Sequence, residues 1–358
     1  MESATPRVVI ISASVGSGHD GAAAELSRRL TALDFDVVRH DFLDLMPRRT
    51  GALLRAVYRW QLETAPRSWG WLLAAGGSRG LGRRLAGVTA LADAGTLAAV
   101  GTGAVAVVST YPLASQVLGR LRRRNLLDMP AFTYLTDMSV HPMWVTDGID
   151  THLAIHDEPA AQARALGAGD VRVVAPVVDP AFTAPGVATG RERWGLPEGK
   201  PLALIVAGAW GVGEIEQTSQ DIAATGLAVP VVACGQNEKL RQRLDRSDYA
   251  VALGWVDDMA ALLRTCQVVV QNAGGLSSLE GLLAGVPVVT YRSLPGHGRS
   301  NAEALDRAGW APWLRTADDL AEGLRRALSP CRGAPDLSAP QPETVIAAGV
   351  PTRLPAAT

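Results

Sequence analysis

The chain of 358 residues has few cysteines and no excess of charge of either sign. Its three cysteines, Cys234, Cys266 and Cys331, lie far apart and form no Cys-x-x-Cys pair. This spacing argues against a disulfide framework or a zinc site and is typical of a protein from a reducing cytoplasm. With 34 basic and 35 acidic residues the net charge is −1, so we expect no nucleic-acid partner.

Long hydrophobic runs are also missing from the chain. No stretch reaches the roughly 20 apolar residues that a membrane-spanning helix needs. The apolar run at residues 7–12 has the length of a strand and is too short for the core of a signal peptide. We therefore expect a cytoplasmic protein that is either soluble or peripheral to a membrane.

The chain does contain a repeated alternation of short apolar runs with helical segments. Its length predicts two domains, and the alternation predicts an α/β protein with a Rossmann-like parallel sheet in each domain. Glycine and proline are concentrated in residues 181–200, so we place the domain boundary there. The expected parts are a first domain at 1–183, a second domain at 184–328 and a Pro- and Ala-rich tail at 329–358, which we expect to be mobile or to lie on the surface.

Residues 269–289 predict a strand, a tight glycine turn, a helix and a second strand. Gly274 and Gly275 allow the backbone to turn and to approach a ligand closely. Ser277 and Ser278 stand where the helix begins, and exposed N–H groups at such a position bind anions. Glu280, in the first turn, can accept hydrogen bonds from sugar hydroxyls. The segment therefore suggests a phosphate-and-ribose site, although an ordinary turn with a capping serine has the same pattern.

A second glycine-rich turn lies near the N-terminus. Gly16, Gly18 and Gly21 form a G-x-G-x-x-G pattern, with Asp41 about twenty residues further on, as in a dinucleotide site. The turn also holds His19 at a helix start, where the helix dipole favours the neutral ring that can accept a proton. A structural role is the alternative for this histidine.

Residues 48–87 differ from the rest of the chain. Their arginines alternate with apolar and aromatic residues, as in segments that lie on a membrane surface. A pair of helices covering the core, with the arginines in solvent, is the alternative. The aromatic residues that we assign to acceptor or membrane contact are Tyr58, Trp60, Trp69 and Trp71.

An ordered series of motifs resembles a known family. The second half contains Gly254-Trp-Val-Asp-Asp-Met, Asn272-Ala-Gly-Gly-Leu-Ser-Ser-Leu-Glu and Leu294-Pro-Gly, and resembles the donor domain of the family-28 glycosyltransferases. The first half resembles the monogalactosyl- and glucosyl-diacylglycerol synthase branch, and the shared residues extend from about 7 to about 325. The motifs quoted for the first half are Ser14-Val-Gly-Ser-Gly-His, Tyr58…Pro66…Trp69, Ser109-Thr-Tyr-Pro, Thr136-Asp137…His141-Pro142 and Pro176-Val177.

This resemblance implies a GT-B fold, a UDP-sugar donor, a lipid acceptor, inversion at the anomeric carbon and no obligatory metal or other cofactor. It also implies roles for individual residues. His19 would be the general base on the acceptor hydroxyl, or would support it, with Asp137 as the second candidate. The donor-site residues would be Gly18 near the reacting centre, Val256 at the uracil, Gly274, Gly275, Leu276 and Ser277 at the diphosphate, Glu280 at the ribose, and His297, Gly298 and Asn301 at the sugar or diphosphate.

The chain departs from the family at three places. His297 and Gly298 stand where the family often has Gln-Glu or Gln-Gln, which leaves the donor sugar open. Tyr111 replaces a histidine that is usual in the branch, and Ser277 replaces a threonine. Because acceptors in this branch are lipids, we favour the membrane reading of residues 48–73 and expect an anionic membrane surface, at the inner face of the cell membrane, as a partner.

Other activities are compatible with parts of the sequence. UDP-GlcNAc-dependent transfer to another lipid-like or natural-product acceptor is the main alternative. An NAD-dependent oxidoreductase would use Gly16, Gly18 and Gly21, but the second half has its own nucleotide-type turn. A UDP-sugar epimerase or a non-catalytic lipid- or nucleotide-binding protein also remains open.

Overall fold

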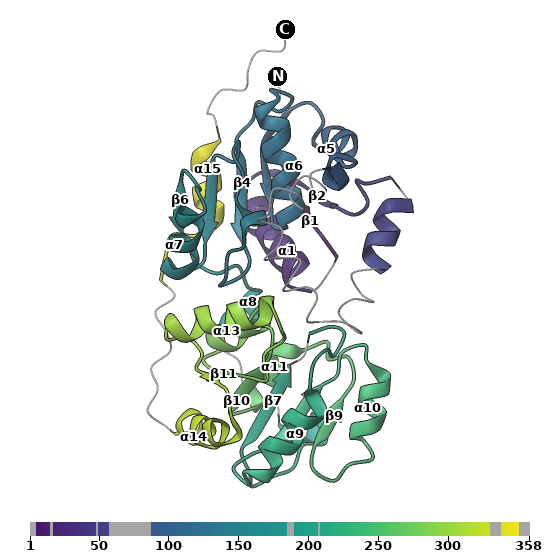
Figure 1. The fold of residues 1–358 in the computed structure, drawn as a ribbon, viewed down its shortest axis with the longest axis vertical. Helices are drawn as coiled ribbons and strands as arrows, with labels where there is room; N and C mark the ends of the chain where they lie inside the picture. Colours follow the sequence, from purple (N-terminus) through teal and green to yellow (C-terminus); the bar gives the residue numbers. More distant parts are fainter. Residues whose placement is uncertain are drawn as a thin grey trace. The chain divides into compact units, whose positions relative to one another are not determined.

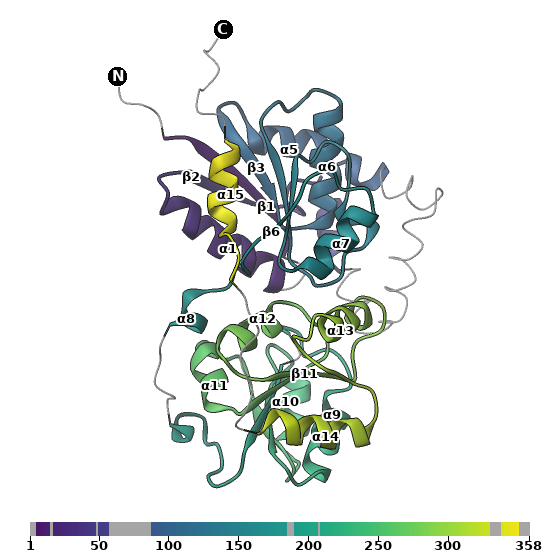
Figure 2. The ribbon, with the colours of Figure 1, turned by 90° about the vertical axis from the view of Figure 1, so that its left-hand side faces the viewer.

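A computed structural model describes residues 5–14, 17–47, 49–56, 87–184, 190–206, 208–329 and 338–350. The chain divides into two units, one formed by Met1–Val177 with Ser338–Thr358 and the other by Val178–Leu337. Figures 1 and 2 show a parallel sheet with helices in each unit.

The first unit contains a six-stranded sheet in the order β2-β1-β3-β4-β5-β6, with all neighbours parallel. The sequences of its inner strands, such as RVVIIS and AVAVVS, are almost continuously apolar because helices cover both faces. The strands are β1 (Arg7–Ser12), β2 (Asp36–Asp41), β3 (Ala104–Ser109), β4 (Ala131–Leu135), β5 (Thr151–Ala154) and β6 (Val171–Val173).

The face of the sheet that each helix covers depends on the direction in which its connection crosses from one strand to the next. The chain moves one way from β1 to β2 and the other way from β2 to β3, so right-handed crossovers put the two connections on opposite faces. Figure 2 shows α1 on one side of the sheet and α5 and α6 on the other. The helices are α1 (Ser17–Thr31), α5 (Asp93–Val100), α6 (Pro112–Arg123), the 3₁₀ turn η1 (Pro142–Trp144) and α7 (Asp157–Ala165); residues 49–56 are also helical.

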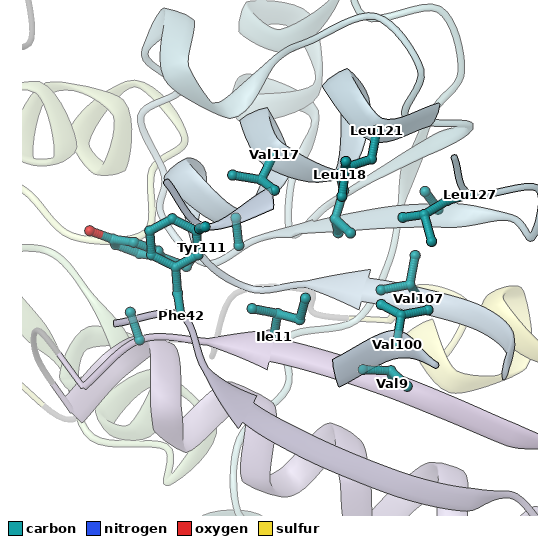
Figure 3. Close-up of a cluster of buried hydrophobic side chains, with 14 of the residues drawn as sticks. Val9, Ile11, Phe42, Val100, Val107, Tyr111, Val117, Leu118, Leu121 and Leu127 are labelled. Carbon is teal, nitrogen blue, oxygen red and sulfur yellow. The ribbon is translucent and has the colours of Figure 1, made fainter. Parts of the chain in front are cut away.

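The core between this sheet and α6 is formed by alternate residues of the strands. Val9 and Ile11 of β1 point toward α6 and pack with Val107 of β3 in one buried cluster. Phe42 and Tyr111, which follow β2 and β3, close the end of the cluster where these strands finish (Figure 3). The polar residues His19 and Thr110 follow the ends of β1 and β3, so the packing of this core also positions them.

The second unit has a sheet in the order β12-β11-β10-β7-β8-β9, again with parallel neighbours. This is the doubly wound order of nucleotide-binding sheets, and the direction reverses between β7 and β10. The strands are β7 (Leu202–Val206), β8 (Val229–Ala233), β9 (Val251–Leu253), β10 (Val268–Gln271), β11 (Val288–Tyr291) and β12 (Trp313–Leu314). The helices are α8 (Pro180–Thr183), η2 (Arg191–Trp194), α9 (Ile215–Ala224), α10 (Glu238–Leu244), α11 (Met259–Thr265), α12 (Leu276–Leu283), α13 (His297–Arg307) and α14 (Ala317–Ala327).

The end of the chain differs from the expected tail at 329–358. Helix α15 (Pro342–Gly349) belongs to the first unit and packs against α1, as Figure 2 shows. Arg29 of α1 donates to the side chain of Gln341 at 2.9 Å and lies 3.7 Å from the carboxylate of Glu343. Ile346 is fully buried. The boundary between the two units also lies earlier than expected. The first unit ends at Val177 rather than at residue 183, so α8 belongs to the second unit.

The segment predicted to contact a membrane lies largely outside the described residues. Of residues 48–87 only 49–56 and 87 are described, and Tyr58, Trp60, Trp69 and Trp71 are not among them. In the part of the chain that the structure describes, no helix combines the length and the apolar character required to cross a bilayer.

Candidate active site

His19 lies in the first turn of α1, directly after the carboxyl end of β1. The order of the first sheet reverses between β1 and β3, and ligands of doubly wound sheets bind outside the carboxyl ends of strands at such a point. Gly18 precedes His19 in the same turn. The structure therefore places the glycine-rich turn where a ligand of this unit is expected.

The ring of His19 is oriented by the ends of two other strands. Its Nδ1 lies 2.8 Å from the carbonyl oxygen of Thr110, after β3, and 3.1 Å from the hydroxyl of Thr136, after β4. A carbonyl oxygen only accepts hydrogen bonds, so Nδ1 carries the proton and donates it to Thr110. The lone pair of the neutral ring is then on Nε2, the nitrogen that can act as a base.

Aromatic side chains restrict the ring further. Tyr111 meets His19 edge to face, with ring centroids 5.4 Å apart and planes at 73°. Trp144, which is fully buried, lies 5.9 Å from the same ring, and Phe42 lies 5.6 Å from Tyr111. Such contacts limit rotation of the imidazole about its side-chain bonds. Tyr111, which stands where the branch usually has histidine, thus packs against the candidate base.

A buried hydroxyl network holds the turn that carries the Thr110 carbonyl. Ser109 donates to the carbonyl oxygen of Tyr111 at 2.7 Å and accepts from Ser115 at 3.0 Å, and Thr133 of β4 donates to Ser115 at 3.0 Å. The sequence motif included Ser109 but gave no reason to expect Ser115 and Thr133 beside it. Ser115 and Thr133 are eighteen positions apart and meet because α6 packs on the sheet in which β3 pairs with β4.

Asp137 follows Thr136 at the carboxyl end of β4 and is buried, with 8% of its surface exposed. Because the carboxyl ends of parallel strands share one edge of a sheet, Asp137 and His19 belong to the same edge of the first unit. Its neighbour Thr136 contacts the Nδ1 of His19 through its hydroxyl at 3.1 Å.

Asp41, the carboxylate expected to bind ribose in a dinucleotide site, is engaged by the protein itself. It accepts hydrogen bonds from the backbone N–H of Ser14 at 3.2 Å, from the hydroxyl of Ser14 and from the backbone N–H of Leu43 at 2.8 Å. Arg55 also donates to it at 3.1 Å. These contacts use the positions that ribose hydroxyls would need, so the geometry disfavours the NAD-dependent alternative.

In the second unit, the turn after β10 has the form that the sequence predicts. Gly274 has φ = +75°, and a methyl group at this position would lie 2.6 Å from Cβ of Asn301. Its backbone N–H donates to the side-chain oxygen of Gln271. Helix α12 then begins at Leu276, with Gly275 before it and Ser277 in its first turn. Glycine is therefore required at 274 by backbone conformation and by space.

Two residues of α13, Asn301 and Gly298, lie against this turn. Asn301 is fully buried and donates to the carbonyl oxygen of Ala273 at 3.0 Å. Its amide nitrogen lies 3.1 Å from Nε2 of His297. A methyl group at Gly298 would lie 2.8 Å from Cβ of Leu294. These contacts place Asn301 as a support of the turn and show that Gly298 packs too closely for the longer side chain that the family often has there.

Glu280 is the fifth of the eight residues of α12 and is partly buried, so it lies just beyond the first turn in which the sequence placed it. Burial, together with the negative charge of Asp179, raises the pKa of its carboxyl to about 7. Asp179 caps α8, which packs against α12, by accepting from the backbone N–H of Ala181 at 2.8 Å. A carboxyl in this environment gains more from a hydrogen-bond donor of a ligand than an exposed one does.

Val256 lies in the loop between β9 and α11 and is partly buried. The neighbouring Trp255 has 59% of its surface exposed. Asp258 anchors the loop because it caps α11 through the backbone N–H of Ala261 at 3.0 Å and pairs with Arg193 at 2.7 Å. The backbone of this loop is thus held at the carboxyl edge of the second sheet, as a base-binding loop would be.

The cysteines and the other side chains that could bind a metal lie apart from this site or from one another in the described residues. Within the described ranges, no three His, Cys, Asp or Glu side chains come together in a group that could hold a metal ion. Cys234 and Cys266 are buried thiols without a disulfide bond, and burial raises the pKa of the Cys234 thiol to about 11. Cys331 lies outside the described residues.

Comparison with known proteins extends these observations. A family model described as monogalactosyldiacylglycerol (MGDG) synthase matches residues 19–175. A protein of Bacillus pumilus named processive diacylglycerol beta-glucosyltransferase is 28% identical over 232 residues, and its counterpart in Bacillus subtilis is 25% identical over 232 residues. Each alignment covers 62% of this chain and 60% of the relative. The first unit of this chain is thus similar in sequence to diacylglycerol-glycosylating proteins.

The chain spans about 60% of the length of these curated relatives. Solved structures agree on the fold. MurG of Acinetobacter baumannii aligns with a TM-score of 0.57 and 14% identity, covering 96% of this chain and 99% of that one. TcCGT1, solved in complex with UDP, aligns with a TM-score of 0.56 and 15% identity, covering 90% of each. The fold is GT-B, as the resemblance implied.

Proposed function

We propose that this protein is an inverting, metal-independent glycosyltransferase that moves a hexose from a UDP-sugar to a hydroxyl of a membrane lipid such as diacylglycerol. The observation that carries the proposal is the orientation of His19. Its proton is fixed on Nδ1 by the Thr110 carbonyl at 2.8 Å, which leaves Nε2 as the base, in a unit related to diacylglycerol-glycosylating proteins. The second unit supplies a separate nucleotide-type turn.

In this proposal Nε2 of His19 takes the proton of the acceptor hydroxyl while its oxygen attacks the anomeric carbon. The bond between that carbon and the diphosphate oxygen breaks on the opposite face, so the configuration inverts and UDP leaves. Gly274, Gly275, Leu276 and Ser277 present the start of α12 to the departing diphosphate, where N–H groups and the helix dipole stabilise negative charge.

The remaining residues have supporting roles. Glu280 accepts hydrogen bonds from the ribose hydroxyls, and the backbone at Val256 meets the uracil. His297 contacts the sugar hydroxyls. Asn301 contacts His297 and donates a hydrogen bond to the carbonyl oxygen of Ala273. Asp137 is the alternative base. If His19→Ala retained near-normal turnover, Asp137 would take its place.

We also propose that the protein acts at the inner face of the cell membrane as a peripheral protein. The basic and aromatic composition of residues 48–73 supports a contact with an anionic surface. Leu53, on the described helical residues 49–56, has 62% of its surface exposed. An apolar side chain in this position suits the boundary between headgroups and acyl chains.

The test is a donor and acceptor screen. The protein is incubated with UDP-galactose, UDP-glucose or UDP-N-acetylglucosamine and vesicles that contain diacylglycerol, and the lipids are analysed by mass spectrometry. We expect a lipid heavier by one hexose with one of the first two donors, and none with His19→Ala. A product only from UDP-N-acetylglucosamine would favour the alternative transferase, and preferential thermal stabilisation by NAD over UDP would contradict the transferase proposal.

A further inference from the structure

The carboxylate of Asp41 is the meeting point of three segments of the first unit. Its Oδ2 accepts from the backbone N–H and the hydroxyl of Ser14 and, at 3.1 Å, from Nη2 of Arg55. Its Oδ1 accepts from the backbone N–H of Leu43 at 2.8 Å. Only 18% of the Asp41 side chain is exposed, so these charge-assisted hydrogen bonds are partly protected from water.

One of the three segments leads to the candidate base. Ser14 stands five residues before His19, on the strand side of the glycine-rich turn. On the helix side, Asp20 follows His19 and accepts from the hydroxyl of Ser12 at 2.5 Å. Each side of the turn is therefore held by a serine and an aspartate. The contact with Asp41 links the turn to the end of β2, in addition to the contacts of His19 with Thr110 and Thr136.

The second segment is the helix of residues 49–56, in which Arg55 stands near the end. This helix packs closely on the residues after β2, because a methyl group at Gly51 would lie 2.0 Å from the carbonyl oxygen of Leu43. Arg55 also approaches Asp44 at 3.5 Å, but Asp44 is 74% exposed and contributes less than Asp41. From Arg55 the chain passes into the residues that we assign to the acceptor and the membrane.

We propose that Asp41 is a positioning residue for His19 and that Arg55 ties the start of the acceptor segment to it. This inference rests on the proposed function, in which His19 is the base. With the carboxylate removed, the N–H and hydroxyl of Ser14 lose their acceptor and the turn shifts relative to Thr110. A displacement of about 1 Å at a reacting group can cost about 100-fold in rate.

The test compares three variants of the full chain. Asp41→Asn keeps the shape but loses the charge, and we expect kcat to fall about 10- to 100-fold with KM for the UDP-sugar within twofold. Arg55→Gln is expected to have a smaller effect of the same kind. Asp36→Asn is the matched control, since Asp36 pairs with Arg7 at 2.8 Å at the opposite end of the same strand. An Asp41→Asn kcat within twofold of the wild type would overturn the proposal.

Hydrogen exchange provides a readout that needs no substrate. Amides of residues 12–14 and 17–21 are expected to exchange faster in Asp41→Asn and Arg55→Gln than in the wild type and in Asp36→Asn, while exchange in α12 stays the same. Unchanged exchange in the turn would overturn the positioning role. Faster exchange in the variants, together with a wild type that glycosylates none of the tested lipids, would support the link between Asp41 and the turn and would contradict the proposed function.

Discussion

His19 and Glu280 are the two side chains whose protonation the structure controls most directly. For His19 the control is geometric, because a carbonyl acceptor selects the tautomer. For Glu280 it is environmental, because burial and a neighbouring carboxylate raise the pKa. The first residue is suited to take a proton, and the second is suited to receive hydrogen bonds from a ligand.

Replacement of His19 by alanine should lower kcat about 100- to 10,000-fold, the usual contribution of a general base. KM for the UDP-sugar should change little, because the donor turn is in the other unit. Steady-state kinetics with the lipid acceptor measures both constants. His156→Asn is the control, since His156 caps α7 through the backbone N–H of Glu158 and asparagine can do the same. Equal losses in the two variants would exclude a catalytic role for His19.

Glu280 should make stability and UDP binding depend on pH in opposite directions. Its pKa in the folded protein, about 7, lies above the ordinary value of 4.5. The contribution of Glu280 to the stability of the folded protein is therefore complete below pH 4.5. It is lost as the pH rises through 7, and the loss amounts to at most about 3 kcal/mol. The ribose hydroxyls of UDP donate stronger hydrogen bonds to the ionised carboxylate of Glu280. The affinity for UDP should therefore rise over the same pH range.

The measurement for Glu280 is chemical unfolding and UDP titration at pH 5 and pH 8. In Glu280→Gln, which cannot ionise, the loss of stability between these pH values should be smaller than in the wild type. UDP should bind roughly 10- to 100-fold more weakly at pH 8, as for a lost hydrogen bond to a charged group. A wild-type affinity in this variant would exclude Glu280 from the donor site.

At the scale of elements, parallel strands collect residues from distant parts of the sequence at one edge of each sheet. The turns after β1, β3 and β4 meet around His19, and the turn after β10 meets α13. Each turn is short and is held by side chains from a neighbouring element. A change in backbone conformation at one turn should therefore affect ligand binding without unfolding the sheet.

Gly274 and Gly285, at the two ends of α12, allow this to be tested. Both have positive φ, +75° and +72°, but only a methyl group at Gly274 would meet another residue, Asn301 at 2.6 Å. Alanine should cost about 1–2 kcal/mol of stability at Gly285 and more at Gly274, where the clash with Asn301 adds to the backbone strain. Only Gly274→Ala should also weaken UDP binding, by at least about tenfold. Isothermal titration with UDP measures the affinity of both variants. An equal loss of UDP affinity in Gly274→Ala and Gly285→Ala would exclude a special role of Gly274.

At the scale of the whole molecule, the nearly balanced charge means that any attraction to a membrane must come from a local group of residues. We expect co-sedimentation with anionic vesicles that weakens as salt rises, because each basic residue near the surface contributes about 1 kcal/mol. Replacement of Trp60 and Trp71 by serine should reduce binding. Trp255→Ser, in the second unit, is the control for an exposed tryptophan. Unchanged sedimentation of the double variant would contradict a membrane contact of these residues.

The sequence predicted the sheets well because their strands consist of β-branched and other apolar residues in short runs. The run at 7–12 matches β1, and the strand expected at the start of residues 269–289 is β10. Gly274 was also predictable, since positive φ strongly favours glycine. In contrast, the contacts of Asp41 with Arg55 and of Thr133 with Ser115 depend on tertiary packing that no local pattern records. The Pro- and Ala-rich composition likewise concealed α15, whose stability comes from burial of Ile346 against the first unit.

The return of α15 to the first unit has a consequence for synthesis on the ribosome. All residues of the second unit, Val178–Leu337, are contiguous and precede α15 in the chain. The second unit can therefore complete its fold while the first still lacks a helix that covers α1. Although N-terminal domains usually finish folding first, here the unit that is begun first is the one completed last, and its final assembly waits for translation of residues 338–350.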